Sequence, residues 1–409
     1  MLGLPANYWR LWSSSAASNL ADGLFFIALP LLAVRLTDSP ILIAGLAIAG
    51  RLPWLVFVLV AGALADRLDR RTTMRNVEFF RVAVVGVLAA LAVMEALSLP
   101  VLYVAAFVLG VGETLFDTAA QSILPSVVDK ERLATANGRL YAVELVMNQF
   151  VGPPLGGVLI GVSVPLVLGS SIVGYALAAL GLTLVVGSFR PQRSGPPTRL
   201  TGDIAEGLRY LWRNRVLRTM AVMVGGMNLA STATFAVLVL YAVSPGPMRL
   251  SEPAFGVLLT TFAIGSLLGS FLAAPLQRRF GRVRMLFLSV VIIGAGLAVP
   301  AFTTSAVVIG ASFAISGVFI VVWNVITVTL RQRIVPDGLL GRVNAGYRLF
   351  AWGTQPIGAL LGGVVGELLG LPAVFLLGGA LGLTMLLARL VIDESAIAAA
   401  EAEGHLAAA

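Results

Sequence analysis

The chain has 409 residues, of which 58% are hydrophobic and 12% charged, whereas soluble domains carry roughly 45–50% apolar and about 25% charged residues. So much apolar surface excludes a water-soluble enzyme and a disordered protein. The net charge of +8 does not indicate a nucleic-acid partner, because the basic residues lie in short connections between apolar blocks. Cysteine is absent and His405 is the single histidine, so we expect no disulfide, no metal site and no cofactor.

The apolar blocks predict an all-α polytopic membrane protein with twelve transmembrane helices. Each block is close to the roughly 20 residues that cross a hydrocarbon core, and its uniform apolarity differs from the alternation of barrel strands. The first block carries Asn19 and Asp22 in its middle, which favours a retained span over a signal peptide. The expected spans are residues 9–34, 40–64, 77–98, 100–124, 139–162, 164–187, 217–243, 254–276, 285–303, 305–330, 343–369 and 371–392.

Arginine placement predicts the orientation. The connections after the even-numbered spans up to the tenth hold Arg67, Arg70, Arg71, Arg75, Lys130, Arg132, Arg190, Arg193, Arg199, Arg209, Arg213, Arg215, Arg278, Arg279, Arg282, Arg284, Arg331, Arg333 and Arg342. The opposite connections offer only Arg35 and Arg249. Because cytoplasmic loops are enriched in lysine and arginine, we expect both termini in the cytoplasm and a plasma membrane of the bacterial inner-membrane type.

One long polar stretch, residues 188–215, divides the chain. The expected domains are an N-terminal six-helix bundle at 1–190, a cytoplasmic linker at 191–216, a C-terminal six-helix bundle at 217–393 and a cytoplasmic tail at 394–409. In the linker Ile204, Leu208, Leu211 and Trp212 recur at helical spacing with arginines on the other face. This pattern predicts a short helix lying on the anionic inner leaflet.

Three sequence matches relate the halves in the same order. SNLADG in the first span returns as MNLAST in the seventh, and LADRLDRR after span two returns as LQRRFGRV after span eight. The stretch from VVDKERLATANGRLYA to GPPLGG matches IVPDGLLGRVNAGYRLFA to GALLGG. Such repeats predict two pseudo-symmetric six-helix bundles enclosing a midplane site.

These residues resemble a known family. GALADRLDRR is similar to the loop signature of the major facilitator superfamily, and FVGPPLGG is similar to the motif of its drug–proton antiporters. AQSILPSVVDKERLATANG resembles the branch that contains macrolide-efflux proteins and the enterobactin exporter. The resemblance implies the major facilitator fold. Many drug antiporters carry an arginine in span four, whereas this chain has Glu113 and Asp117.

Charges inside spans cost at least about 2.5–3.5 kcal/mol each, so they indicate function. The residues expected to couple protons are Asp22, Arg51, Glu113, Asp117 and Glu144. All are in the first half, and the second half is expected to hold neutral polar groups instead. Asp22 is either a proton carrier or a structural ion-pair partner.

The acids of span four share one helix face, about 6 Å apart. Two carboxylates at that separation resist simultaneous ionisation, which favours a proton or cation site. The alternative is a structural cluster neutralised by Arg51, which we expect to pair with one of the acids. Glu144 lies near the cytoplasmic end of span five, where pairing with loop arginines is an alternative.

Two segments are candidate gates. The loop residues are Gly62, Asp66, Arg67, Arg70 and Arg71, whose arginines are expected to pair with acids such as Glu78 or Asp129; the residues of span five are Gly152, Pro153, Gly156 and Gly157. Contacts that break on opening provide the two packings of a transporter, and proline with glycine permits a kink and close helix contact. A topology signal and ordinary packing are the alternatives.

The candidate substrate residues are Asn148, Asn228, Trp323, Asn324, Trp352 and Gln355. Aromatic surface with isolated hydrogen-bonding groups suits a bulky apolar solute, although such residues also pack helices. We expect a monomeric exporter that uses protons to move amphipathic small molecules, including antibiotics, across the lipid bilayer. The alternatives are a siderophore exporter, a lysophospholipid flippase and, more distantly, an intramembrane enzyme.

Overall fold

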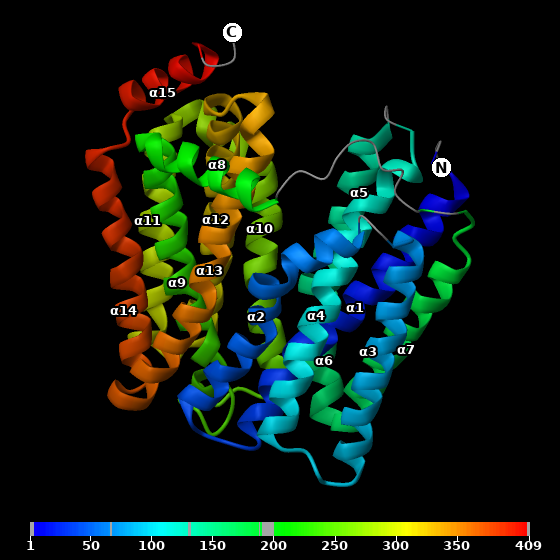
Figure 1. Ribbon diagram of the computed structural model, residues 1–409. Coiled ribbons are helices and arrows are strands. Elements are labelled where there is room, and N and C mark those ends of the chain that lie inside the picture. Colours follow the sequence, from blue (N-terminus) through cyan, green and yellow to red (C-terminus); the bar gives the residue numbers. More distant parts are fainter. Residues whose placement is uncertain (1–3, 66–67, 130–131, 188, 190–199, 407–409) are drawn as a thin grey trace. The chain divides into compact units, whose positions relative to one another are not determined.

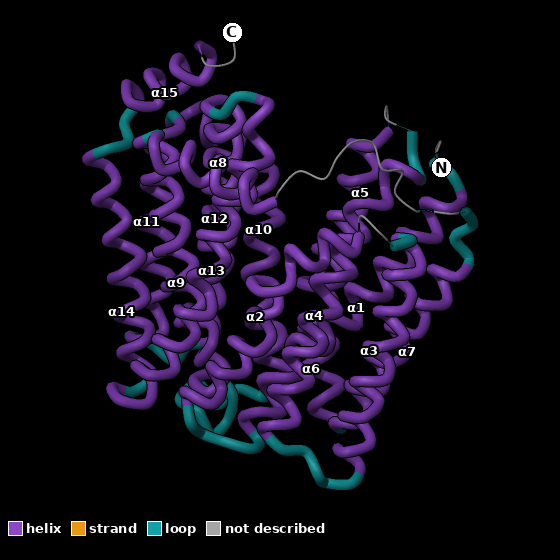
Figure 2. The backbone as a smooth tube through the Cα atoms, viewed as in Figure 1, coloured by secondary structure: helices purple, strands orange, loops and turns teal. Residues whose placement is uncertain are grey.

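The computed structural model describes residues 4–65, 68–129, 132–187, 189 and 200–406, whose regular elements are helices (Figure 1, Figure 2). They provide 12 candidate membrane spans that are long and apolar enough to cross a bilayer. The predicted fold class is thereby confirmed, and most predicted spans agree with a helix to within a few residues. Span three is an exception, because its helix begins at Arg70 and not at residue 77.

Contacts divide the chain into two compact units. Unit 1 comprises Met1–Ser194 and Val239–Thr260, and unit 2 comprises Gly195–Leu238 and Thr261–Ala409. The helices of the first half are α1 (Ala6–Val34), α2 (Pro40–Ala65), α3 (Arg70–Val93), α4 (Leu99–Ile123), α5 (Leu133–Leu145), α6 (Gly152–Val162) and α7 (Val164–Thr183). Those of the second half are α8 (Leu200–Arg213), α9 (Arg215–Ala242), α10 (Glu252–Phe280), α11 (Arg282–Ala298), α12 (Ala306–Ile334), α13 (Asp337–Leu369), α14 (Leu371–Thr384) and α15 (Glu394–Leu406).

The helix of span five is interrupted, whereas the matching helix of the second half, α13, is continuous. A π-helical stretch, η3 (Val146–Val151), separates α5 from α6. The first half advances 13 positions from Arg139 to Gly152, whereas the matching stretch of the second half advances 10 positions from Arg348 to Gly358. The π-helical stretch, a form found mostly as single-turn bulges inside α-helices, therefore lies in the segment that is three residues longer in the first half.

Small residues bring α6 directly against α1. A Cβ atom on Gly152 would lie 2.5 Å from the Cα of Gly23, and one on Gly156 would overlap the side chain of Ile27. Backbones that approach this closely pack well in lipid, where van der Waals contact replaces the hydrophobic effect as the force between helices. The Pro–Gly motif of span five therefore has a packing role within unit 1.

The repeat of this motif in unit 2 brings α13 directly against α9. A Cβ atom on Gly358 would overlap the carbonyl oxygen of Leu229 on α9, and one on Gly362 would overlap the carbonyl oxygen of Ala233. Gly362 and Gly156 are the fifth residues of the matching sequences GALLGG and GPPLGG. The two units thus repeat this helix contact.

The linker helix α8 packs on protein. Leu211 is fully buried, and a Cβ atom on Gly207 would overlap the carbonyl of Arg342 on α13. The ring centroids of Trp212 and Phe350 are 5.8 Å apart. The helix α8 therefore packs on α13 through part of its apolar face, which the missing side chain at Gly207 permits, while Trp212 stays 47% exposed. Its contact with the inner leaflet stays a prediction.

The C-terminal tail includes a helix, α15, that belongs to unit 2. Arg282 at the start of α11 bonds Glu394 through Nε at 2.8 Å and Glu401 through Nη1 at 2.7 Å. Ile397 is fully buried in the hydrophobic core of the unit. Ion pairs and apolar burial therefore both fix α15.

Candidate functional site

Three helices of unit 1 bring a buried ionic cluster together. Its members are Ser18 and Asp22 of α1, Glu78 and Arg81 of α3, and Tyr175 of α7. Arg81 Nη1 lies 3.4 Å from Asp22 Oδ1 and 3.3 Å from Glu78 Oε1. Ser18 Oγ donates to Glu78 Oε1 at 2.9 Å, and the Tyr175 hydroxyl donates to Asp22 Oδ1 at 2.8 Å. Helical spacing explains the arrangement, because residues three or four apart share a face.

Solvent reaches this cluster mainly at one carboxylate. The side chain of Arg81 is 1% exposed and that of Glu78 0%, whereas that of Asp22 is 25% exposed. Aromatic faces cover the cation, with Arg81 Cζ 5.4 Å from the Phe116 ring centroid and 5.3 Å from that of Tyr175. Two carboxyl groups share one guanidinium, so ionisation of both would leave one negative charge uncompensated.

The predicted acids gather around this cluster. Glu113 and Asp117 are half-buried on α4, and Glu144 is exposed on α5. Electrostatic interactions link Glu113 and Asp117 to both Asp22 and Arg81, and link Glu144 to Asp22. The structure therefore places all four predicted acids in one acid-rich region of unit 1.

Arg51, the expected partner of these acids, is exposed on α2 and interacts electrostatically with Glu113. Among the described residues, ion pairs within 4 Å to acids inside the spans of α1 and α3 come from Arg81. Arg81 is therefore the cation at Asp22, and the expected pairing of Arg51 with an acid of span four stays a prediction.

Sequence reasoning missed the buried pair of Glu78 and Arg81, and it missed Tyr175. The sequence interpretation pairs Glu78 with the loop arginines and leaves Arg81 out, although the expected span at residues 77–98 contains both residues. Since α3 starts at Arg70, Glu78 lies about two turns inside the helix. A signal was available, because an acid and an arginine three residues apart in an apolar span can neutralise each other.

The predicted gating loop is described in part. Asp66 and Arg67 lie outside the described residues, and Gly62 is described only as part of the helix α2. Arg71 Nη1 donates to the carbonyl oxygen of Val185 at 2.6 Å. The described end of the loop is therefore tied to the segment that follows α7.

Asp69 adds to this connection. Its carboxylate caps α3 by accepting the Thr72 N–H at 2.9 Å and also accepts the Phe189 N–H at 2.7 Å, while the Arg70 N–H donates to the Phe189 carbonyl at 3.5 Å. Partial burial acts to raise the pKa of Asp69, but the backbone hydrogen bonds and the nearby Arg71 charge lower it below its usual value. Asp69 is therefore a charged anchor at physiological pH.

The Pro–Gly motif has a second neighbour within unit 1. A Cβ atom on Gly157 would lie 2.6 Å from the carbonyl oxygen of Glu252, and one on Gly256 would overlap the carbonyl of Pro153. The helix α6 is thus held between α1 and the first turn of α10. Close contact on both sides leaves no room for a larger side chain at the glycines of this motif.

Two of the predicted substrate residues make packing contacts in unit 2. Asn228 Nδ2 donates to the carbonyl oxygen of Ala351 at 2.8 Å, which joins α9 to α13. Trp323 is 3% exposed and belongs to the hydrophobic core of the unit. These contacts match the packing alternative, and substrate contact by either residue stays a prediction.

The other four predicted substrate residues retain accessible surface. Asn324 is exposed, Trp352 is 42% exposed, and Asn148 and Gln355 are half-buried. The guanidinium of Arg348 lies 5.6 Å from the Trp352 ring centroid. Their role in substrate binding stays a prediction.

The helices α12 and α13 of the second half also carry arginines, beside the expected neutral polar groups. Arg331 lies inside α12, with Cζ 3.7 Å from the Tyr347 ring centroid, and Arg348 lies inside α13. The sequence placed Arg331 in a loop because span ten was expected to end at residue 330, whereas α12 continues to Ile334. A cation on an aromatic face is stabilised without an acid.

Two compact units with 12 candidate spans define a polytopic membrane protein by class. The chain belongs to the major facilitator superfamily, in the MFS_3 family described as Transmembrane secretion effector, whose model matches residues 6–408.

Two relatives are named as efflux proteins. The chain is 29% identical over 392 residues to the Multidrug efflux pump Tap of Mycolicibacterium fortuitum, covering 92% of this chain and 93% of the pump. It is 20% identical over 395 residues to the Macrolide efflux protein A of Streptococcus pyogenes, covering 95% and 96%. Family and relatives support an efflux transporter of a bacterial inner membrane, consistent with a protein that is not an enzyme.

Solved structures agree with the fold. A bacterial homologue of the iron transporter ferroportin is similar with a TM-score of 0.70 and 18% sequence identity, covering 94% of this chain and 99% of that one. At this identity the likeness concerns the fold alone.

Proposed function

We propose that this protein exports amphipathic small molecules of the multidrug type by alternating access, in exchange for protons. The names of its relatives support the substrate class. The observation that carries proton coupling is the ionic cluster, where two carboxyl groups share the single guanidinium of Arg81 in a buried place. An uncompensated buried charge is costly, so the pair of acids binds one proton in the resting cluster.

Geometry assigns different roles to the two acids in this proposal. Asp22 accepts hydrogen bonds from Tyr175 and Arg81 and is the carboxylate that solvent reaches, so it exchanges protons with water. Glu78 Oε2 is buried and has no hydrogen-bond partner among the described residues, which favours Glu78 as the acid that holds the proton.

Proton release then drives a change of packing. Without its proton, the cluster carries a net negative charge between α1, α3 and α7. That charge disfavours the present packing of the three helices and favours an alternative in which water or a cationic solute reaches Asp22. Return of the proton restores the packing described above.

The test distinguishes proton coupling from the ability to move substrate across the membrane. In proteoliposomes, E78Q and D22N are expected to abolish efflux of ethidium against its gradient when a pH gradient is imposed. Both variants should retain ethidium counterflow, the exchange of labelled for unlabelled dye without net movement, because counterflow needs no proton. E95Q, which changes an exposed acid after α3, is the matched control. Uphill efflux by the double variant D22N/E78Q at the wild-type rate would refute this assignment.

A further inference from the structure

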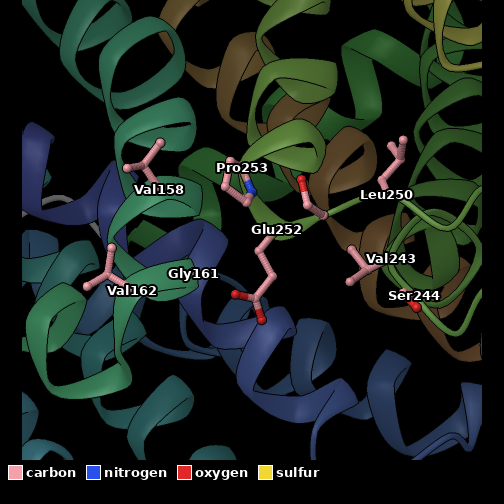
Figure 3. A pocket seen from close by; sticks show the side chains of 9 residues that line it. Val158, Gly161, Val162, Val243, Ser244, Leu250, Glu252 and Pro253 are labelled. Atoms are coloured by element: carbon pink, nitrogen blue, oxygen red, sulfur yellow. The ribbon is translucent and has the colours of Figure 1, made fainter.

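An open cavity of about 600 Å³ lies in unit 1 at the end of α6 (Figure 3). Val158 and Val162 of α6 form one wall, and Val243 and Leu250, from the connection between α9 and α10, form the other. Glu252 lies between the two walls. Drug-sized ligands occupy apolar cavities of roughly 300–1,000 Å³ that contain a few polar groups, so both the size and the lining suit an amphipathic molecule.

The carboxylate of Glu252 has one oxygen engaged. Oε1 accepts Arg35 Nη2 at 2.6 Å and Arg35 Nε at 3.1 Å. The other oxygen, Oε2, faces Gly161 in the cavity lining, where an added Cβ atom would lie 3.7 Å from it. Hydrogen bonds to Glu252 from the described residues reach Oε1 only, which leaves Oε2 as an acceptor on the cavity side.

Main-chain contacts fix this carboxylate. The tight approach of Gly157 to the Glu252 carbonyl and of Gly256 to Pro153 seats the first turn of α10 on α6. The Glu252 side chain is 17% exposed, whereas that of Arg35 is 43% exposed. Arg35 Nη2 also donates to the carbonyl oxygen of Ile160 on α6 at 3.3 Å. The acid is therefore the more buried partner of the ion pair, and the arginine is the more exposed one.

We propose that this cavity is a second binding site, which takes an organic cation with an apolar body and uses Glu252 Oε2 as the counter-charge. The inference rests on the proposed export function, and it places the site on the side that the arginine pattern predicts to be non-cytoplasmic. Arg35 keeps Oε1 and repels the bound cation, which weakens binding where an exporter releases its substrate.

Opposite effects of two neutral variants test the proposal. With ethidium as a permanently charged substrate, E252Q is expected to raise the KM of efflux about tenfold and R35Q to lower it several-fold, because Arg35 competes for the same carboxylate. The KM for chloramphenicol, an uncharged amphiphile, should be unchanged in both variants. E95Q is again the matched control.

Other outcomes overturn the site. If E252Q and R35Q impair both substrates equally, the ion pair is a structural brace. The swapped pair R35E/E252R distinguishes the two roles again, because it restores a brace but removes the carboxylate from the cavity and should not restore ethidium affinity. Ethidium binding to the purified protein in nanodiscs, measured without transport, tests the binding site independently of the proposed export. A protein that binds ethidium through Glu252 but exports nothing would refute the proposed export function and support the binding site.

Discussion

The two units share a glycine contact between helices but differ in the charged residues that lie within them. Gly156 brings α6 against α1 in unit 1, and Gly362 brings α13 against α9 in unit 2. In unit 1 an arginine and two acids form the ionic cluster. In unit 2 Arg331 lies on the face of Tyr347, and the acids of α13, Asp337 and Glu367, stand at or near its ends.

This difference shows which features a duplicated fold preserves. Main-chain contacts between helices determine the architecture, so a small residue is required at the same place in both units. Buried charge destabilises a membrane helix unless it is compensated, so the proposed proton coupling gives the acids of unit 1 a role that unit 2 need not share.

The largest effect is expected at Arg81. R81M leaves Glu78 and Asp22 buried without their cation, and removal of one partner of a buried ion pair costs about 3–5 kcal/mol. We expect a strongly lowered melting temperature in detergent and no efflux. The double variant R81M/E78M should recover most of the melting temperature because it removes one charge of each sign. A stable R81M would show that the cluster is not compensated by this arginine.

Equal effects are expected at the repeated glycines. A leucine at Gly156 or at Gly362 must displace the neighbouring helix, and overpacking of this kind costs about 1–3 kcal/mol. The melting temperatures of G156L and G362L should fall by similar amounts. G138L, at a glycine with no neighbouring atom within 4 Å of an added Cβ atom, is the control. A large difference between the first two variants would contradict equivalent packing.

A smaller effect is expected at Arg331. R331Q removes a cation–π contact, which is worth about 1–2 kcal/mol when it is partly desolvated. The variant should lose some thermal stability and keep the wild-type ratio of uphill efflux to counterflow. Loss of uphill efflux with counterflow retained would place proton coupling in unit 2 as well and so remove the contrast between the units.

The smallest effect is expected at Asp69. D69A removes the cap of α3 and should cost about 1 kcal/mol, whereas the matching position of the second half is Gly281, which provides no side-chain cap. The pKa of Asp69 is lowered in the folded protein, so its contribution is present above its unfolded value of about 3.9 and is lost as the pH falls through the folded value. Urea titrations should show the wild type and D69A converging in acid.

Sequence reasoning predicted the fold more completely than the site. Apolar length and arginine-rich connections are local signals, so the spans could be located. The ionic cluster depends on a contact between α1, α3 and α7 that no local pattern contains. Glu78 and Arg81 both lie within the expected span at residues 77–98, but nothing local to either residue shows that it meets Asp22 of α1. Arg331 is missed for a different reason, because the expected span ends at residue 330 and α12 continues to Ile334.

The docked tail has a practical consequence for cloning. A chain truncated at Asp393 would lose Glu394 and Glu401, both partners of Arg282, and would uncover the apolar surface that Ile397 covers. Affinity tags and fluorescent reporters therefore belong after Leu406, where the fused peptide leaves α15 complete, and expression trials with shortened chains would underestimate the yield of the intact transporter.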